Sequence, residues 1–162
     1  MKASKSELLD LHASMHECMR VVLDHAATAP FTVLTEKLAG FGLPTVREQI
    51  AHVFSAETAW VSALRMLPQL RRFDPDTLSS VEDLRRAQRE AISFTLDYLS
   101  STTEDELNSL LPRYHEEWTS PHRTPGFILM HVITHAFHHK GQIVAMLRLL
   151  GYPAPDTDMQ RH

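Results

Sequence analysis

Four histidines fall within twelve residues near the end of the sequence, in the stretch from His131 to Gln142. In a helix, at about 100° per residue, residues four apart lie on one face, one turn from each other. This spacing places His131, His135 and His139 on a shared face. Two imidazoles with this spacing can bind the same metal ion. Clustered imidazoles without a metal ion are costly to bury, because the donor and the acceptor nitrogen of each ring then need hydrogen-bond partners away from water. The stretch therefore predicts half of a metal site.

A third ligand has to come from elsewhere in the chain. Zinc, nickel and related divalent ions bind imidazole nitrogen at about 2.0–2.2 Å, and three protein ligands with open positions are typical of a catalytic site. His52 is the best candidate, because it lies in the middle of a predicted helix on its apolar side. A single histidine in a core usually serves only to form hydrogen bonds. Together with His135 and His139, however, a metal-ligand role for His52 is the better interpretation. Small residues beside His52 leave room for another molecule: Ala56, Ala59 and Ala63.

The other histidines fit a metal site less well. His131 is a candidate for lining the pocket, whereas His138 lies off the His135 axis and is expected to pack or to face solvent. His12 and His16 have the same four-residue spacing and form a competing metal pair. Nothing flanking them resembles a site, so we expect them to line a cleft between helices instead. A di-iron carboxylate site is disfavoured, since the proposed core faces lack the Glu-x2-His pairs it needs.

The composition predicts a single soluble globular domain covering residues 1–162. The apolar content of 43% and charged content of 22% argue against disorder, and the formal charge of −4 counts against a nucleic-acid partner. The single cysteine, Cys18, excludes an internal disulfide and suits a reducing cytoplasm. No long apolar run indicates a signal peptide or a membrane span. We therefore expect a cytoplasmic protein that binds neither nucleic acid nor membrane.

Hydrophobic spacing and capping signals predict four long helices. We expect them to reach about Ala27, Met66, Leu99 and Leu150, and to be capped at their starts by Ser6, Thr45 with Glu48, Ser80 and Thr124. The segment 28–44 is expected to be a loop with one short turn, and the tail from about Tyr152 to be loosely ordered. This pattern predicts an all-α four-helix bundle. The alternatives are a larger irregular all-α fold, or a bundle with a small β-ribbon near Tyr114–Trp118.

The last predicted helix is apolar nearly all round. Opposite His135 it carries Ile133, Phe137 and Val144, with Leu129 and Leu147 to one flank. A helix of this kind is usually buried on two sides. We therefore predict a homodimer in which a partner chain covers the second side.

Two segments together resemble the DinB-like family, also called the YfiT-like metal-dependent enzymes. They are His52-x4-Glu57-x2-Trp60, and His135-x2-His138-His139-Lys140-Gly141-Gln142 followed by Leu147-Arg-Leu-Leu-Gly151. The resemblance covers most of the chain in order and spacing. It implies a four-helix bundle with up-down-down-up topology, often dimeric, that binds one divalent ion, zinc or nickel, through three histidines. Carried over to this chain, these ligands are His52, His135 and His139, which favours His139 over His138.

The resemblance is less specific about the reaction. Some relatives are thiol S-transferases that use bacillithiol or mycothiol, one such group isomerises maleylpyruvate, and many have no known reaction. A three-histidine ion lowers the pKa of a bound water or thiol, so we expect a thiol S-transferase acting on small electrophiles, or a hydrolase. The candidate proton-transfer residues are His131, His16 and Glu48. The alternative is a non-catalytic bundle in which the ion ties two helices together, with a stress-response or scaffolding role.

Overall fold

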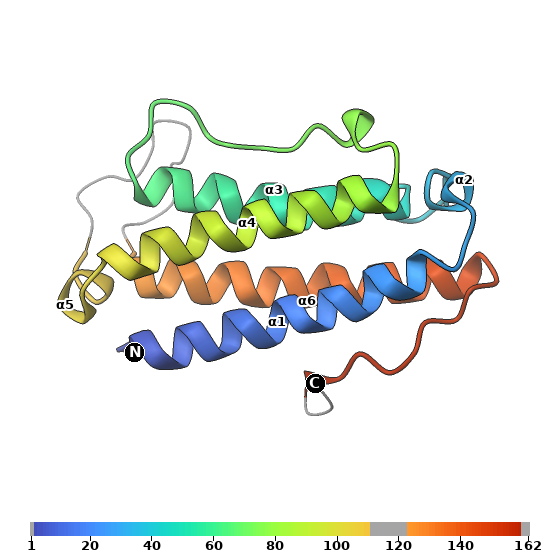
Figure 1. Cartoon of the computed structure of the whole chain (residues 1–162). Helices are drawn as coiled ribbons and strands as arrows, with labels where there is room; N and C mark the ends of the chain where they lie inside the picture. Colours follow the sequence, from blue (N-terminus) through green and yellow to red (C-terminus); the bar gives the residue numbers. More distant parts are fainter. Residues whose placement is uncertain (1, 111–122, 160–162) are drawn as a thin grey trace.

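The computed structural model describes residues 2–110 and 123–159, and in this part of the chain all regular elements are helical. Four long helices form a bundle, and the shorter elements lie in the connections (Figure 1). This confirms the predicted all-α four-helix bundle; the alternative β-ribbon at Tyr114–Trp118 lies outside the described residues. The elements are α1 (Lys5–Ala26), α2 (Phe31–Leu34), α3 (Val46–Leu64), η1 (Pro75–Thr77), α4 (Val81–Ser101), α5 (Glu104–Leu107) and α6 (Pro125–Leu149).

The four long helices pack in a square in which each contacts two neighbours. Helix α3 packs against α6 and α4, and α1 packs against the same two helices. Helices α1 and α6 run in one direction, and α3 and α4 run in the other (Figure 1). This is the up-down-down-up order that the family resemblance implies. Among the described helices, none has the length and apolar character needed to cross a lipid bilayer.

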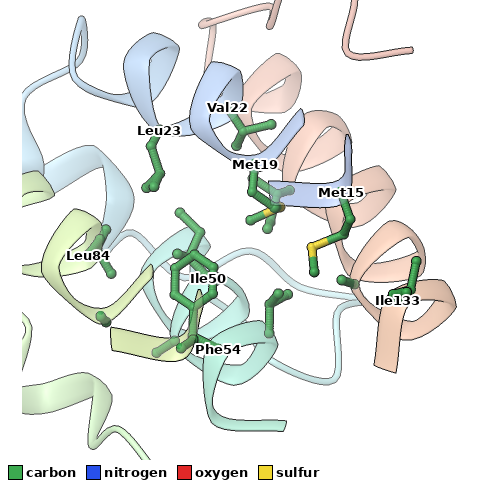
Figure 2. Packing of buried hydrophobic residues seen from close by; sticks show 14 of the residues in the cluster. Met15, Met19, Val22, Leu23, Ile50, Phe54, Leu84 and Ile133 are labelled. Atoms are coloured by element: carbon green, nitrogen blue, oxygen red, sulfur yellow. The ribbon is translucent and has the colours of Figure 1, made fainter. Parts of the chain in front are cut away.

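The core is made of apolar side chains that all four long helices turn inward. Phe54 is fully buried, and burying one side chain of this size contributes roughly 1.5–3 kcal/mol. The core includes residues from each long helix, shown in Figure 2: Met15, Met19, Val22 and Leu23 of α1, Ile50 and Phe54 of α3, Leu84 of α4 and Ile133 of α6.

Three of the four predicted helix caps are confirmed. The side chains of Thr45, Ser80 and Thr124 each accept a hydrogen bond from the backbone N–H three residues further on. Thr45 and Glu48 form a complete capping box, in which the Glu48 carboxylate accepts from the Thr45 backbone N–H at 2.9 Å. Helix α3, which carries His52, therefore starts at a well-defined residue.

The predicted cap at Ser6 is wrong. Helix α1 starts at Lys5 with Ser4 in the N-cap position, and Ser4 makes no side-chain capping bond. Side chains of the α5 region satisfy the free backbone donors instead: Lys5 N–H donates to Glu104 Oε1 at 3.2 Å, and Ala3 N–H donates to Asn108 Oδ1 at 2.7 Å. Long-range hydrogen bonds thus join the start of α1 to the α5 region.

The C-terminal end of α6 agrees with the sequence prediction better than that of α3. Helix α3 ends at Leu64, short of the predicted Met66, because Met66 takes a φ of 54° and the N–H of Leu67 bonds back to the carbonyl of Ser62. Helix α6 ends beside the predicted stop at Gly151, which takes a φ of 85°. Beyond it the chain continues without a helix through Asp158, and Lys140 Nζ donates to the carbonyl of Thr157.

Most of the second apolar face of α6 is covered within the single chain. Leu129, Ile133 and Leu147 are buried, while Phe137 and Val144 are partly exposed. Because α6 packs on both α1 and α3, its two-sided burial does not require a partner chain. The homodimer therefore stays a prediction, resting on a smaller apolar surface than the sequence indicated.

We expect Thr45→Ala to lower the free energy of unfolding by about 1 kcal/mol, because it removes the side-chain N-cap of α3 and leaves the Glu48 carboxylate only the backbone N–H of residue 45 as a donor. Urea unfolding followed by circular dichroism measures this change. Ser6→Ala is the matched control and should change the free energy by less than about 0.5 kcal/mol. Equal losses in the two variants would contradict this assignment of the caps.

Candidate metal centre

Helices α3 and α6 bring the imidazoles of His52, His135 and His139 to one place. Nε2 of His135 lies 3.2 Å from Nε2 of His52 and 3.1 Å from Nε2 of His139. The ring centroids are 4.4 to 5.0 Å apart, and all three side chains are partly buried. The three ligands predicted from the sequence are thus neighbours in the structure.

Gln49 fixes the orientation of His139. Its Nε2 donates to the carbonyl of Leu43 at 3.0 Å, so its Oε1 is free to accept a hydrogen bond from Nδ1 of His139 at 2.6 Å. Because Nδ1 then carries the hydrogen, Nε2 of His139 presents its lone pair toward the other two rings. Gln49 is 1% exposed, so little water competes for this bond. The sequence reasoning missed Gln49; the signal was a polar residue one turn before His52.

Hydrogen bonding alone does not satisfy the three converging nitrogens. Nε2 of His135 faces the Nε2 atoms of both His52 and His139. It carries at most one hydrogen, and Nε2 of His139 can only accept one, so the three atoms cannot all be paired by hydrogen bonds. A single cation satisfies all three lone pairs at once. In a tetrahedral site with Zn–N bonds of about 2.0 Å, ligand atoms lie roughly 3.3 Å apart, close to the separations here. The donor set therefore fits a divalent metal ion.

Burial and crowding keep these imidazoles neutral. Burial, followed by the nearby His139 and His52, lowers the pKa of His135 from 6.5 to about 4. Burial, followed by His52 and His138, lowers the pKa of His139 to about 4, and burial lowers the pKa of His52. A neutral imidazole has the lone pair that a metal ion needs. The three nitrogens are consequently available for binding at neutral pH.

The histidine cluster borders a cleft of about 400 Å³. Of the three small residues predicted beside His52, Ala56 and Ala59 line this space, whereas Ala63 is buried in the core. Of the three histidines, His52 and His135 line this cleft. The lining residues are His52, Ser55, Ala56, Ala59, Trp60, Arg72 and His135.

The other two histidines of α6 lie at the edge of this centre. His131 is exposed, and its ring stands edge-on to Trp60 with centroids 5.5 Å apart and lies 5.8 Å from the ring of His135. His138 is exposed as well, as predicted, and its Nε2 lies 3.1 Å from Nε2 of Gln142.

Two other candidate positions are used differently. The carboxylate of Glu48 is held by the capping box at the start of α3, where it accepts from both the backbone and the hydroxyl of Thr45. His16 lies with His12 in a separate buried cluster that does not include the three-histidine centre.

Comparison with known proteins places the chain in a family. A model of the DinB family matches residues 4–162. The chain belongs to the DinB family. It is 26% identical over 125 residues to protein DinB of Bacillus subtilis strain 168, in an alignment covering 71% of this chain and 70% of that protein. Its fold resembles the crystal structure of a DinB family member from Shewanella denitrificans, with a TM-score of 0.65, 18% identity, and 96% and 92% of the two chains covered.

We expect Gln49→Ala to weaken divalent-metal binding about 10- to 100-fold, because His139 loses the acceptor that fixes its tautomer and ring orientation. Isothermal titration of metal-free protein with Zn²⁺ measures the affinity. Gln69→Ala, an exposed glutamine outside the site, is the control and should bind as the unmodified protein does. An unchanged affinity in Gln49→Ala would show that this hydrogen bond does not support a metal ligand.

The lowered histidine pKa values also predict how the metal-free protein responds to acid. The unfolded chain binds protons near pH 6.5, whereas the folded His135 and His139 do so only near pH 4. The unfolded state therefore binds more protons between these values, and stability should fall as the pH falls from about 6.5 to about 4. Urea midpoints across this range measure the effect. A His135→Gln/His139→Gln variant should show a shallower dependence, and identical slopes would contradict the assignment.

Proposed function

We propose that this DinB family protein is a divalent-metal-dependent enzyme whose ion is held by His52, His135 and His139. The observation that carries the proposal is the convergence of three neutral imidazole nitrogens at the edge of a cleft. Zinc and nickel are the ions we expect, since both accept imidazole nitrogen well. The cleft offers a small molecule access to the open side of the site.

The reaction we propose is transfer of a low-molecular-weight thiol to a small electrophile, with hydrolysis as the related alternative. A divalent ion held by His52, His135 and His139 would lower the pKa of a thiol or water and polarise an electrophile. In the transfer, the thiol loses its proton, sulfur bonds to the electrophilic carbon, and the leaving group departs with the electron pair of the broken bond. In hydrolysis, water takes the place of the thiol.

The chain's own groups support this division of roles. Its single cysteine, Cys18, is fully buried, and burial raises the pKa of the thiol, so the reacting sulfur has to come from a co-substrate. Arg72 and Trp60 lie in the cleft wall, where they would contact a bound substrate. His131, exposed beside Trp60, is the best-placed group to accept the proton.

His139→Ala and His138→Ala form a matched pair of adjacent histidines. We expect His139→Ala to lose the ion of the three-histidine centre and to lower turnover on the order of 100-fold or more, because it removes a ligand. His138→Ala should keep both, since this ring faces solvent. Elemental analysis of the purified variants, with turnover measured against a panel of thiols, electrophiles and esters, provides the readout.

Thermal unfolding of the same variants separates catalysis from a structural role. If His139→Ala loses its metal but melts at the temperature of the unmodified protein, the ion is not needed for the fold. If it melts far lower, and metal-loaded protein turns over none of the panel, the ion serves to tie α3 to α6. That second result would replace the enzyme proposal with the non-catalytic alternative.

A further inference from the structure

A second cluster of metal-ligating side chains lies in the bundle interior, away from the three-histidine centre. His12 and His16 of α1 meet Glu57 of α3, and each of these side chains is 5% exposed or less. Nε2 of His12 lies 2.7 Å from Glu57 Oε1, and Nε2 of His16 lies 3.1 Å from Glu57 Oε2 and 3.1 Å from Nε2 of His12. Thr95 of α4 donates to Glu57 Oε1 at 2.7 Å.

The two clusters are separated by the geometry of α3. Glu57 follows His52 by five residues, which is about 140° around the helix axis. Helix α3 therefore presents His52 toward α6 and Glu57 toward α1 and α4. Sequence spacing had indicated only the His12 and His16 pair, because the carboxylate that completes the cluster comes from a helix more than forty residues further along the chain.

Hydrogen bonds leave this cluster incompletely paired. Within the described part of the chain, Glu57 Oε2 and His16 Nδ1 are buried without a hydrogen-bond partner, although Oε2 lies close to His16 Nε2. If both Nε2 atoms carry hydrogens for Glu57, two N–H groups face each other at 3.1 Å. If one of them is an acceptor, the buried carboxylate loses a donor. Neither arrangement satisfies all the groups, and unsatisfied buried polar groups are costly.

The charge of Glu57 increases this need. Glu57 is 1% exposed, and its two carboxylate oxygens face the imidazoles of His12 and His16. Buried charges in proteins are normally paired with an opposite charge or bound to a metal ion.

We propose that His12, His16 and Glu57 form a second, independent site for a divalent first-row transition-metal ion such as Zn²⁺ or Fe²⁺. Two imidazoles and one carboxylate are a common donor set for such ions when open positions remain. The contacts of 2.7 to 3.3 Å between the ligand atoms match those around an ion with bonds of about 2.0–2.2 Å. Thr95 then supports the carboxylate by donating to it.

A cleft of about 520 Å³ between α1 and α4 gives access to this site. His12 and His16 line it, and Gln88 beside them donates to the backbone carbonyl of His16 at 2.8 Å, which ties α4 to α1. An entry path and room for further ligands are both requirements of a functional metal site. The apolar part of the wall consists of Leu9, Ala13, Ile92 and Leu96.

Metal stoichiometry tests the proposal without reference to any activity. Metal-free unmodified protein titrated with Co²⁺ should bind two ions per chain, and a His52→Ala/His135→Ala variant should bind one. Adding Glu57→Gln to that variant should abolish binding, since the amide keeps the shape of the side chain but not its charge. His25→Gln, on the same helix as His12 but hydrogen-bonded to the carbonyl of Tyr152, is the control and should leave the count unchanged.

A measurement on the unmodified protein covers the case in which the buried variant fails to fold. Co²⁺ at this site should shift the ring proton NMR signals of His12 and His16 strongly. Unshifted His12 and His16 signals at saturating Co²⁺, or no ion bound to the His52→Ala/His135→Ala variant, would overturn the proposal and leave a metal-free ion pair. The His52→Ala/His135→Ala variant measures the second site without the three-histidine centre. Failure of one site is therefore distinguishable from failure of the other.

Discussion

The packing of α3 against α6 is the interaction on which the remainder of the structure depends. It brings together His52 and His135, which are 83 residues apart in sequence, and joins Gln49 to His139 by a short hydrogen bond. Polar groups at a helix interface have to be matched, because little water reaches them. A small rotation of α3 would break these contacts while leaving its apolar residues buried. The polar residues thus select one rotation of α3 among those that the apolar core alone would allow.

Local signals in the sequence predicted most of the fold. The capping residues Thr45, Ser80 and Thr124 and the glycine after α6 act within a few residues of themselves, so sequence alone reveals them. Of the two errors in helix boundaries, only the one at α1 involves a distant part of the chain. Helix α1 starts where side chains of the α5 region accept its free backbone donors. Helix α3 ends where a non-glycine residue adopts a left-handed conformation, which no local pattern indicated.

The residues of the candidate sites likewise fall into those that local spacing reveals and those that depend on contacts between helices. The four-residue spacing of His135 and His139 is a local pattern, and His52 followed from its place on an apolar helix face. Gln49 and Glu57 were not assigned roles, because each acts on a histidine of another helix. Which side of α3 faces which neighbour depends on the arrangement of the whole bundle. Helical periodicity gives the angle between two residues on one helix, but not the partner that each of them meets.

The parallel alignment of α3 and α4 has a consequence for how the chain folds. Because both helices run the same way (Figure 1), the chain has to return along the length of the bundle between Leu64 and Val81 before α4 begins. A tight turn cannot join them as it would join antiparallel neighbours. Contacts between distant segments carry a loop-closure entropy that must be met before they stabilise the chain. We therefore expect slower folding than for an up-down-up-down bundle of equal size.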